Sequence, residues 1–563
     1  MRSVTGPRPP VVGVLVARLA GPRRTGGRVR QVHSPPSRPL LVTSRAPSVV
    51  PPARRAGPQH NAASSGPLPA GAPGPPRLAS SDVATSVLWF RRDLRLADHP
   101  ALLAAHAAAG GDGGGPGVVP LFVVDPALWE PAGPTRRAWL VRSLRALDAS
   151  LGGTTRRPVL VVRHGDPAGV VPALAHEVGA ASVHVTADAG PYGRRRDDAV
   201  AAALADAGGR LVRTGTPYAV GPGTVTNGSG APYKVFTPFF KAWARHGWPA
   251  PAASPPEDLE WHGAARSTSG SAPATDPLPE EPDLEGLELP DVGEQAALTR
   301  WHAFLAGEVD GGGVTEYADR RDRPGVDGTT SMSAHLKYGE IHPRTMLADL
   351  SHRRGAGADT LRSELGWREF YADVLWHRPE SAREYLRPEY AGMRYADPDR
   401  TKTARAHLEA WQEGRTGYPF VDAGMRQLRA TGWVHNRVRM VVASFLVKDL
   451  HVEWQHGARW FMRWLRDGDL ASNQHGWQWV AGSGTDAAPY FRVFNPVSQG
   501  EKFDPDGTYV RRYVPELAHL AGKAAHAPWD VLDGYAHGYP ERIVDHAAER
   551  VEALARYAEV RGG

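Results

Sequence analysis

Residues 86–102 read SVLWFRRDLRLADHPAL: a short apolar run that predicts a buried strand, then a charged loop and the start of an Ala- and Leu-rich helix. Comparable apolar runs, separated by helical segments, recur at VVPLFVVD (118–125), RPVLVVRHG (157–165) and ASVHVTAD (181–188). Strands that alternate with helices favour a parallel sheet with helices on its faces, and this pattern ends near Gly215. The sequence therefore predicts an α/β domain over residues 83–215.

Two further segments follow this domain. Residues 216–297 are dense in Pro, Gly, Ser and acidic residues, which is typical of a long surface connection, although its length is unusual within a compact fold. From residue 298 onward, long helical periods replace the strand signals, as in LRSELGWREFYADVLWHR. We therefore expect an all-α domain over residues 298–556.

The amino-terminal residues 1–81 hold twelve Arg and no Lys, Asp or Glu, among many Pro, Gly, Ser and Ala. Such a composition buries too little apolar surface to fold, so we interpret residues 1–82 as a disordered or artefactual extension. The alternative is an organelle transit peptide, which has the same Arg-rich, acid-free character. Without these arginines the chain has 54 basic and 60 acidic side chains, so its net charge of +6 is no evidence for nucleic-acid binding. Any such surface must be a local patch.

The chain has no cysteine, which excludes disulfides, thiolate metal sites and cysteine nucleophiles. No apolar run reaches the ~18 residues that a membrane-spanning helix needs. There is no P-loop or dinucleotide-binding fingerprint at a strand-to-helix turn, which argues against a nicotinamide-linked enzyme. We expect a soluble, cytoplasmic protein that does not act at a membrane.

Two expected helices each place chemically useful side chains on one face. Glu364, Trp367 and Arg368 are spaced i, i+3 and i+4, so an acid, an aromatic plate and a cation lie together. The same spacing recurs at Asn436, Arg439 and Met440. Either triplet alone is explained equally well by an amphipathic helix with a solvated charged edge.

Residues 467–489, DGDLASNQHGWQWVAGSGTDAAP, combine two carboxylates, an amide and two indoles at their start. Trp477 and Trp479 are two residues apart, so their side chains point to opposite sides in a helix or a strand. A polar, Gly-rich sequence around large indoles suggests a backbone held close to a flat aromatic ligand. Buried core tryptophans are the ordinary explanation.

Together these stretches resemble the photolyase/cryptochrome family, and most of all the class I photolyases that split cyclobutane pyrimidine dimers in DNA. The resemblance covers about residues 84–555 and includes VLWFRRDLRLADHPAL, YADRRDRPGVDGTTSMSAHLKYGEIHPR, LGWREFYADVLW and TGYPFVDAGMRQLRATGWVHNRVRMVVASFLVKDL. It implies a Rossmann-like parallel sheet, a long connecting loop and a helical domain that binds FAD in a U shape. It also implies light-driven repair: excited reduced FAD gives one electron to a flipped-out dimer, the ring opens and the electron returns, with no metal.

The resemblance implies a flavin site in the helical domain. Tyr317 matches a flavin-contacting tyrosine, and the segment that binds the flavin diphosphate matches Thr329, Thr330, Ser331, Met332 and Ser333. The turn that lies against the isoalloxazine and ribityl chain matches Asp467, Gly468 and Asp469. Arg439 would pair with Asp467, and Asn473 would face flavin N5.

The substrate side follows from the same resemblance. Glu364 matches the acid that hydrogen-bonds the flipped-out dimer, and a protonated Glu364 would be the better donor to its carbonyls. The other dimer contacts match two aromatic walls and two smaller contacts, Trp367, Trp479, Asn436 and Met440. The residues expected to hold the DNA backbone are Arg321, Arg368, Arg437 and Gln499.

The chain departs from the family at two places. The family commonly reduces its flavin through three tryptophans; Trp477 and Trp454 match two of them, but the third position falls on Thr401. Tyr395 or another nearby aromatic residue could take its place, or the protein could depend on chemical reductants. For the second, antenna chromophore, folate-using relatives carry an acidic residue where this chain has Gly193, which favours a deazaflavin over methenyltetrahydrofolate.

Two related functions are the alternatives. A flavin photoreceptor, or cryptochrome, that signals through a partner has the same fold. The (6-4) photolyases carry histidine at the position of Met440, which argues against that lesion here. We expect a monomer whose partner is damaged DNA and which is found with the nucleoid when it is bound there.

Overall fold

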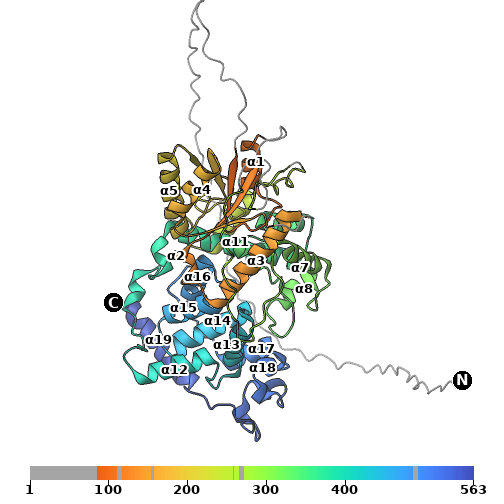
Figure 1. Ribbon diagram of the computed structural model, residues 1–563. Helices are drawn as coiled ribbons and strands as arrows, with labels where there is room; N and C mark the ends of the chain where they lie inside the picture. Colours follow the sequence, from red (N-terminus) through yellow and green to blue (C-terminus); the bar gives the residue numbers. More distant parts are fainter. Residues whose placement is uncertain are drawn as a thin grey trace, which may run out of the picture. The chain divides into compact units, whose positions relative to one another are not determined.

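The computed structural model describes residues 85–110, 117–153, 158–257, 259–264, 272–485 and 492–562 (Figure 1). All of them belong to one compact unit, Ser80–Gly563. The extension expected over residues 1–82 lies outside the described residues. Within the described ranges, no helix is both long enough and apolar enough to cross a membrane.

A five-stranded parallel sheet forms the first part of this unit. Its strand order is β3-β2-β1-β4-β5, with β1 at Ser86–Phe90, β2 at Val118–Val124, β3 at Val161–His164, β4 at Ser182–Val185 and β5 at Arg210–Arg213. The first four confirm the strands expected from the apolar runs. The sequence analysis does not identify β5, because this strand lies at the edge of the sheet and has an exposed arginine at each end.

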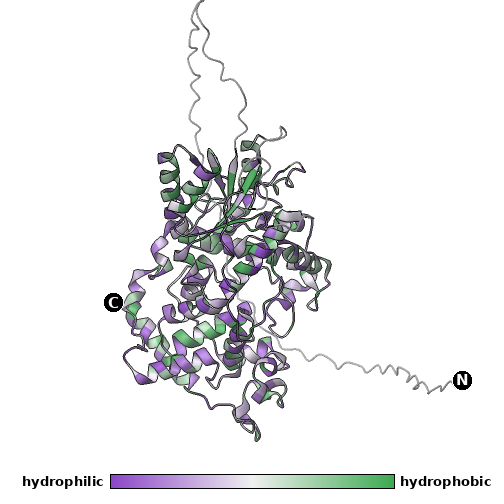
Figure 2. Ribbon diagram, in the orientation of Figure 1, coloured by the Kyte–Doolittle hydropathy of each residue, from purple (hydrophilic) through white to green (hydrophobic). Residues whose placement is uncertain are grey.

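Helices cover both faces of the sheet. They are α1 (Pro100–Ala108), α3 (Pro134–Gly152), α4 (Pro167–Glu177) and α5 (Pro191–Asp206), and a short α2 (Pro126–Trp129) follows β2. Leu88 and Phe90 of β1 pack with α1 and α3, while Val87 and Trp89 pack with α4 and α5. Because both faces are buried, the central strands are continuously apolar, as their green colour in Figure 2 shows.

The second part of the unit is helical, and among the described residues it contains no further strand of the sheet. Its larger helices are α7 (Glu294–Ala306), α8 (Gly313–Arg320), α9 (Ser333–Tyr338), α10 (Pro343–Leu350), α11 (Ala356–His377), α12 (Lys402–Glu413), α13 (Pro419–Thr431), α14 (Asn436–Ser444), α15 (Trp454–Trp464), α16 (Leu470–Ala481), α17 (Pro496–Phe503), α18 (Thr508–Tyr513) and α19 (His546–Gly562). This confirms the expected fold class, an α/β domain followed by a large helical domain.

The connecting segment, residues 216–297, is more than the surface loop that its composition suggests. It contains α6 (Phe236–His246), which packs against α11. The side chains of α6 that are buried in this contact are Phe236, Phe239 and Trp243. Further along, the backbone of Val118 in β2 accepts from His262 (2.9 Å) and donates to Glu260 (2.9 Å). The expectation of a loop is therefore corrected, because this segment contributes to both the helical core and the sheet.

Close backbone contact joins α3 of the sheet region to α15 of the helical region. The Thr135 hydroxyl donates to the Trp464 carbonyl oxygen (2.6 Å), and the Arg136 guanidinium donates to the Met462 carbonyl oxygen (3.1 Å). Gly133, at the start of α3, is held so tightly that a Cβ placed there would lie 1.6 Å from the carbonyl oxygen of Arg463. The fit between the two regions therefore depends on a glycine at this position.

We expect Gly133→Ala to force α3 away from α15 and to lower the free energy of unfolding by about 1–3 kcal/mol, as overpacking does. Chemical denaturation measures this change. The matched control is Gly169→Ala in α4, where a Cβ meets no atom within 4 Å and the helix gains from alanine. Equal effects of the two substitutions would contradict the tight contact.

Candidate functional site

Residues 329–333, the expected diphosphate segment, are held by Arg300 of α7. Its guanidinium donates to the carbonyl oxygens of Thr329 (2.8 Å) and of the next residue (3.2 Å). It also pairs with both carboxylate oxygens of Asp327 (2.7 and 2.8 Å). Ser331 has φ of +58°, a left-handed conformation that residues other than glycine seldom adopt. Such strain is concentrated at ligand sites, which agrees with a binding role for this segment.

The turn at residues 467–469 is fixed by two ion pairs. Arg439 of α14 donates to Asp467 (2.8 Å), as expected from the sequence. Asp469 caps the amino end of α16 by accepting from the Ser472 amide (3.0 Å), and it also pairs with Arg92 (2.8 Å). Because Arg92 lies two residues after the end of β1, this pair connects the carboxyl edge of the sheet to the turn.

The electrostatics of this turn favour an ionised Asp469. Burial raises the pKa of Asp469, but the charges of Arg92 and then Arg368 outweigh it and hold the pKa at about 2. Asp467 presents a different feature: its Oδ1 atom is buried and has no hydrogen-bond partner in the described part of the chain. A buried carboxylate oxygen of this kind is an acceptor that a bound N–H or O–H group can satisfy.

Helix α16, which begins at this turn, contains three of the residues that the sequence analysis expects at the site: Asn473, Trp477 and Trp479. The Asn473 side-chain amide donates to the Ala458 carbonyl oxygen (3.2 Å), which orients it against α15. Trp477 is buried and packs edge-on against Phe461, with ring centroids 5.0 Å apart. Trp479 points away from Trp477 in the helix and is half-buried at the edge of the same apolar cluster.

A chain of alternating charges connects three helices of the site. Glu364 of α11 pairs with Arg321 (2.5 Å), which follows α8. The adjacent Asp322 pairs with Arg437 of α14 (2.8 Å). In this arrangement the side chain of Glu364 has the Arg321 guanidinium as its partner.

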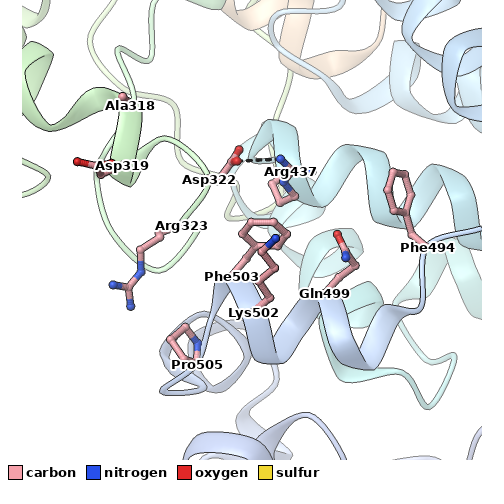
Figure 3. A pocket seen from close by; sticks show the side chains of 10 residues that line it. All are labelled: Ala318, Asp319, Asp322, Arg323, Arg437, Phe494, Gln499, Lys502, Phe503 and Pro505. Atoms are coloured by element: carbon pink, nitrogen blue, oxygen red, sulfur yellow. Dashed lines mark hydrogen bonds and ion pairs between the residues drawn. The ribbon is translucent and has the colours of Figure 1, made fainter. Parts of the chain in front are cut away.

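The charge chain ends in a groove with a volume of about 590 Å³ (Figure 3). Its lining residues are Ala318, Asp319, Asp322, Arg323, Arg437, Phe494, Gln499, Lys502, Phe503 and Pro505. The ring of Phe503 lies between two cations, with the Arg437 guanidinium 4.4 Å and the Lys502 amine 5.1 Å from its centroid. The groove therefore has three cations and two aromatic rings beside two carboxylates, although the residues after the extension are mildly acidic overall.

Trp367 lies one turn after Glu364 on α11. One face of its indole is covered by Phe236 of α6, with ring centroids 3.7 Å apart and planes within 10°. This stacking fixes the plane of the indole. Nearby, Tyr317 of α8 is buried and packs edge-on against Phe304, with ring centroids 5.8 Å apart.

Arg368 does not join the groove, although the sequence analysis expects it to contact the DNA backbone. Its guanidinium donates to the carbonyl oxygens of Pro217 (3.0 Å) and Leu336 (3.2 Å) and lies 4.4 Å from the ring of Tyr218. The donors of this arginine are therefore used inside the protein, between the connecting segment and α9. By contrast, the predicted Arg437 and Gln499 line the groove together, and Asn436 is exposed at the start of α14.

Several residues of the site escape the sequence analysis. Arg92 lies in the charged loop after β1, and its ion pair with the turn depends on tertiary structure. Phe236 lies in the segment interpreted as a loop, although the amphipathic pattern of FTPFFKAWARH was an available signal. Lys502 and Phe503 end α17 in QGEKF, where neither residue type has a distinctive spacing. No group of three or more His, Asp or Glu in the described ranges is placed to hold a metal ion.

Comparison with known proteins identifies the family. The model described as DNA photolyase matches residues 86–257, and the one described as FAD binding domain of DNA photolyase matches residues 360–559. The deoxyribodipyrimidine photo-lyase of Halobacterium salinarum is 39% identical over 501 residues, which cover 84% of this chain and 99% of that protein. This chain belongs to the DNA photolyase family.

Solved photolyase and cryptochrome structures share the fold. A bacterial class III photolyase from Agrobacterium tumefaciens matches with a TM-score of 0.75 and 37% identity, over 86% of this chain and all of that one. The cryptochrome of Synechocystis sp. PCC6803 matches with a TM-score of 0.71 and 26% identity, over 84% of this chain and all of that one. Because both classes match, likeness of fold does not choose between a photolyase and a photoreceptor.

We expect the Asp469 carboxylate to make stability depend on pH. Its pKa is about 2, below the ordinary 3.8, so its contribution is complete above pH 3.8 and is lost as the pH falls through 2. This loss amounts to about 2 kcal/mol of the free energy of unfolding. Urea denaturation at a series of acidic pH values should give a shallower pH dependence for Asp469→Asn than for the wild type.

The control is Asp206→Asn, which changes an exposed carboxylate at the end of α5. This variant should keep the pH dependence of the wild type. Identical curves for wild type and Asp469→Asn would contradict a stabilising ion pair with Arg92.

Proposed function

We propose that this chain is a deoxyribodipyrimidine photo-lyase that uses light and FAD to split cyclobutane pyrimidine dimers in DNA. The observation that carries the proposal is the charge chain from Glu364 through Arg321 and Asp322 to Arg437. It connects an acid able to hydrogen-bond a pyrimidine to cations able to bind phosphate. The full-length relatives that bear this name support the assignment.

The residues of the helical region fit a flavin. The buried Oδ1 of Asp467 lacks a partner among the described residues and suits an N–H of the ring or a hydroxyl of the ribityl chain. Arg439 holds this carboxylate in place, and the strained segment at Ser331 offers backbone and hydroxyl donors to the diphosphate. When bound, reduced and excited by light, FAD supplies the electron that opens the dimer.

A dimer inside a duplex must be flipped out to reach this site, and damage lowers the cost because stacking and pairing are already weakened. The indole planes of Trp367 and Trp479 replace the lost stacking, which contributes roughly 1–3 kcal/mol per base. Arg437 and Lys502 bind the backbone without reading sequence, as repair of random lesions requires.

The ion pair of Glu364 suggests how DNA binding prepares the acid. A phosphate competes for Arg321, because arginine binds phosphate through charge-assisted hydrogen bonds. Once Arg321 has moved to the phosphate, the side chain of Glu364 is released from this ion pair and is available to hydrogen-bond the dimer.

The proposed activity is tested with a DNA oligonucleotide that contains one defined cyclobutane thymine dimer, mixed with the FAD-loaded protein after chemical reduction. Blue light should restore intact thymines, and darkness should not. Glu364→Gln keeps a hydrogen-bonding group and should retain repair, whereas Glu364→Ala should lower its rate by about 10²-fold, as loss of one stabilising donor does.

Equal losses in the two variants would contradict the hydrogen-bonding role of Glu364. Bound FAD without any repair of this dimer would overturn the proposed function. It would leave a photoreceptor or a photolyase for the (6-4) lesion as the remaining functions.

We further propose that the antenna chromophore is a deazaflavin, bound where the strand order of the sheet reverses between β1 and β4. In open parallel sheets, ligands bind at this crevice, outside the carboxyl ends of the strands. Asp188 follows β4 here, and Gly193 of α5 lies directly against its carboxylate: a Cβ at Gly193 would be 2.1 Å from Asp188 Oδ2. The acidic side chain of folate-using relatives therefore has no room at this position.

The antenna is identified by mass spectrometry of the chromophores released from protein that was produced in a deazaflavin-synthesising host. We expect a deazaflavin in addition to FAD, and an absorbance band beyond those of FAD. Release of a folate, or of FAD alone at two molecules per chain, would contradict the proposal.

A further inference from the structure

We propose that Tyr385 is the terminal electron donor of the aromatic relay in this protein, and that Glu453 accepts its phenolic proton. This inference rests on the proposed flavin chemistry and concerns how an oxidised flavin gains one electron on its way back to the reduced form. In this proposal, Tyr385 and Glu453 together take the role of the third tryptophan, which this chain lacks at Thr401.

Thr401 stands where the third tryptophan is expected, and its side chain has a structural role instead. It is exposed and caps the amino end of α12, where its hydroxyl accepts from the Ala404 amide (3.3 Å). A threonine hydroxyl is not oxidised by a tryptophan radical. The relay must therefore end elsewhere, or stop at Trp454.

Aromatic residues lead from α16 through α15 to Tyr385. The ring of Trp477 lies against Gly457 of α15, so closely that a Cβ on Gly457 would be 2.1 Å from it. Trp454 lies one turn earlier on the same helix and is fully buried. The ring of Tyr385 packs edge-on against Trp454, with centroids 6.0 Å apart and planes at 86°.

Glu453 makes Tyr385 suitable as a donor. The Tyr385 hydroxyl donates to Glu453 Oε1 (2.8 Å), so the proton acceptor is already in place. Burial raises the pKa of Tyr385, and the neighbouring Tyr395 and Glu453 raise it further. The phenol therefore keeps its proton at neutral pH, and it loses that proton only together with an electron.

Tyr395 is an aromatic neighbour of Tyr385. The Ala396 amide donates to the His451 carbonyl oxygen (2.8 Å), which places Tyr395 beside the segment that carries Glu453. Tyr395 is half-buried, whereas Tyr385 is buried. By contrast, Trp411, which also meets Trp477 (6.1 Å), is fully buried and donates its N–H to the Val442 carbonyl oxygen.

When FAD is bound in its oxidised form, the photoexcited flavin would be the oxidant and would take one electron from Trp477. Trp454 would then refill Trp477. Tyr385 gives one electron to the Trp454 radical cation and its phenolic proton to Glu453. The products are a neutral tyrosyl radical, a protonated carboxyl and two restored indoles, and an added thiol returns a hydrogen atom to the tyrosine.

The test uses the full chain loaded with oxidised FAD, excited by a light flash, and follows tryptophan and tyrosyl radicals by transient absorption and electron paramagnetic resonance. The wild type should form a tyrosyl radical more slowly in D₂O than in H₂O. Tyr385→Phe should lose this radical, and Glu453→Gln, which keeps a hydrogen bond but accepts no proton, should slow its formation by about 10²-fold.

The matched control is Tyr390→Phe, a buried tyrosine of the neighbouring 3-10 helix whose ring stacks on Tyr557, with centroids 5.7 Å apart. It should leave the radical unchanged. A radical that persists in Tyr385→Phe and vanishes in Tyr395→Phe or Trp411→Phe would overturn the assignment, as would formation unaffected by Glu453→Gln. FAD content and circular dichroism confirm that each variant is folded.

The proposed relay and the proposed repair activity can be rejected independently of each other. Repair by chemically reduced Tyr385→Phe should equal that of the wild type, because the relay is not needed once the flavin is reduced. If no variant repairs the dimer, the radical measurement still decides the role of Tyr385.

Discussion

The ion pair between Arg92 and Asp469 holds the functional centre of this protein together. Arg92 lies two residues after the central strand of the sheet, and Asp469 starts the helix that carries Asn473 and Trp477. Together with the contact between α3 and α15, this ion pair sets the position of the turn at residues 467–469 relative to the carboxyl edge of the sheet.

The second organising feature is the uneven distribution of charged side chains in a protein that is mildly acidic after the extension. Paired carboxylates stabilise the interior, while the groove beside Phe503 gathers Arg323, Arg437 and Lys502. Asp322 in the same groove neutralises part of this charge through its pair with Arg437. DNA bound in the proposed way must therefore compete with Asp322 for Arg437.

Local sequence patterns predict much of this fold. Four of the five strands, the helical second part and the family relation follow from apolar runs and motifs, and they are confirmed. What could not be predicted depends on tertiary contacts: the pair of Glu364 with Arg321, the stacking of Phe236 on Trp367, and the internal bonds of Arg368. Helical spacing places Glu364 and Arg368 on one face, but it does not tell which neighbour each side chain meets. The edge strand was missed because an exposed arginine at each end leaves it only two apolar residues, and α6 was missed because its amphipathic pattern lies within a segment rich in Pro, Gly and Ser.

The contact between α6 and α11 also has a consequence for synthesis of the chain. The apolar face of α6, with Phe236 and Trp243, is completed only by α11, whose Phe370 is made roughly a hundred and thirty residues later. At the usual rate of roughly 5–20 residues per second, this face waits about 7–26 s for its partner on the ribosome. During that time an aromatic surface is open to misassociation, so production of the protein should depend on chaperones more than its stability alone would suggest.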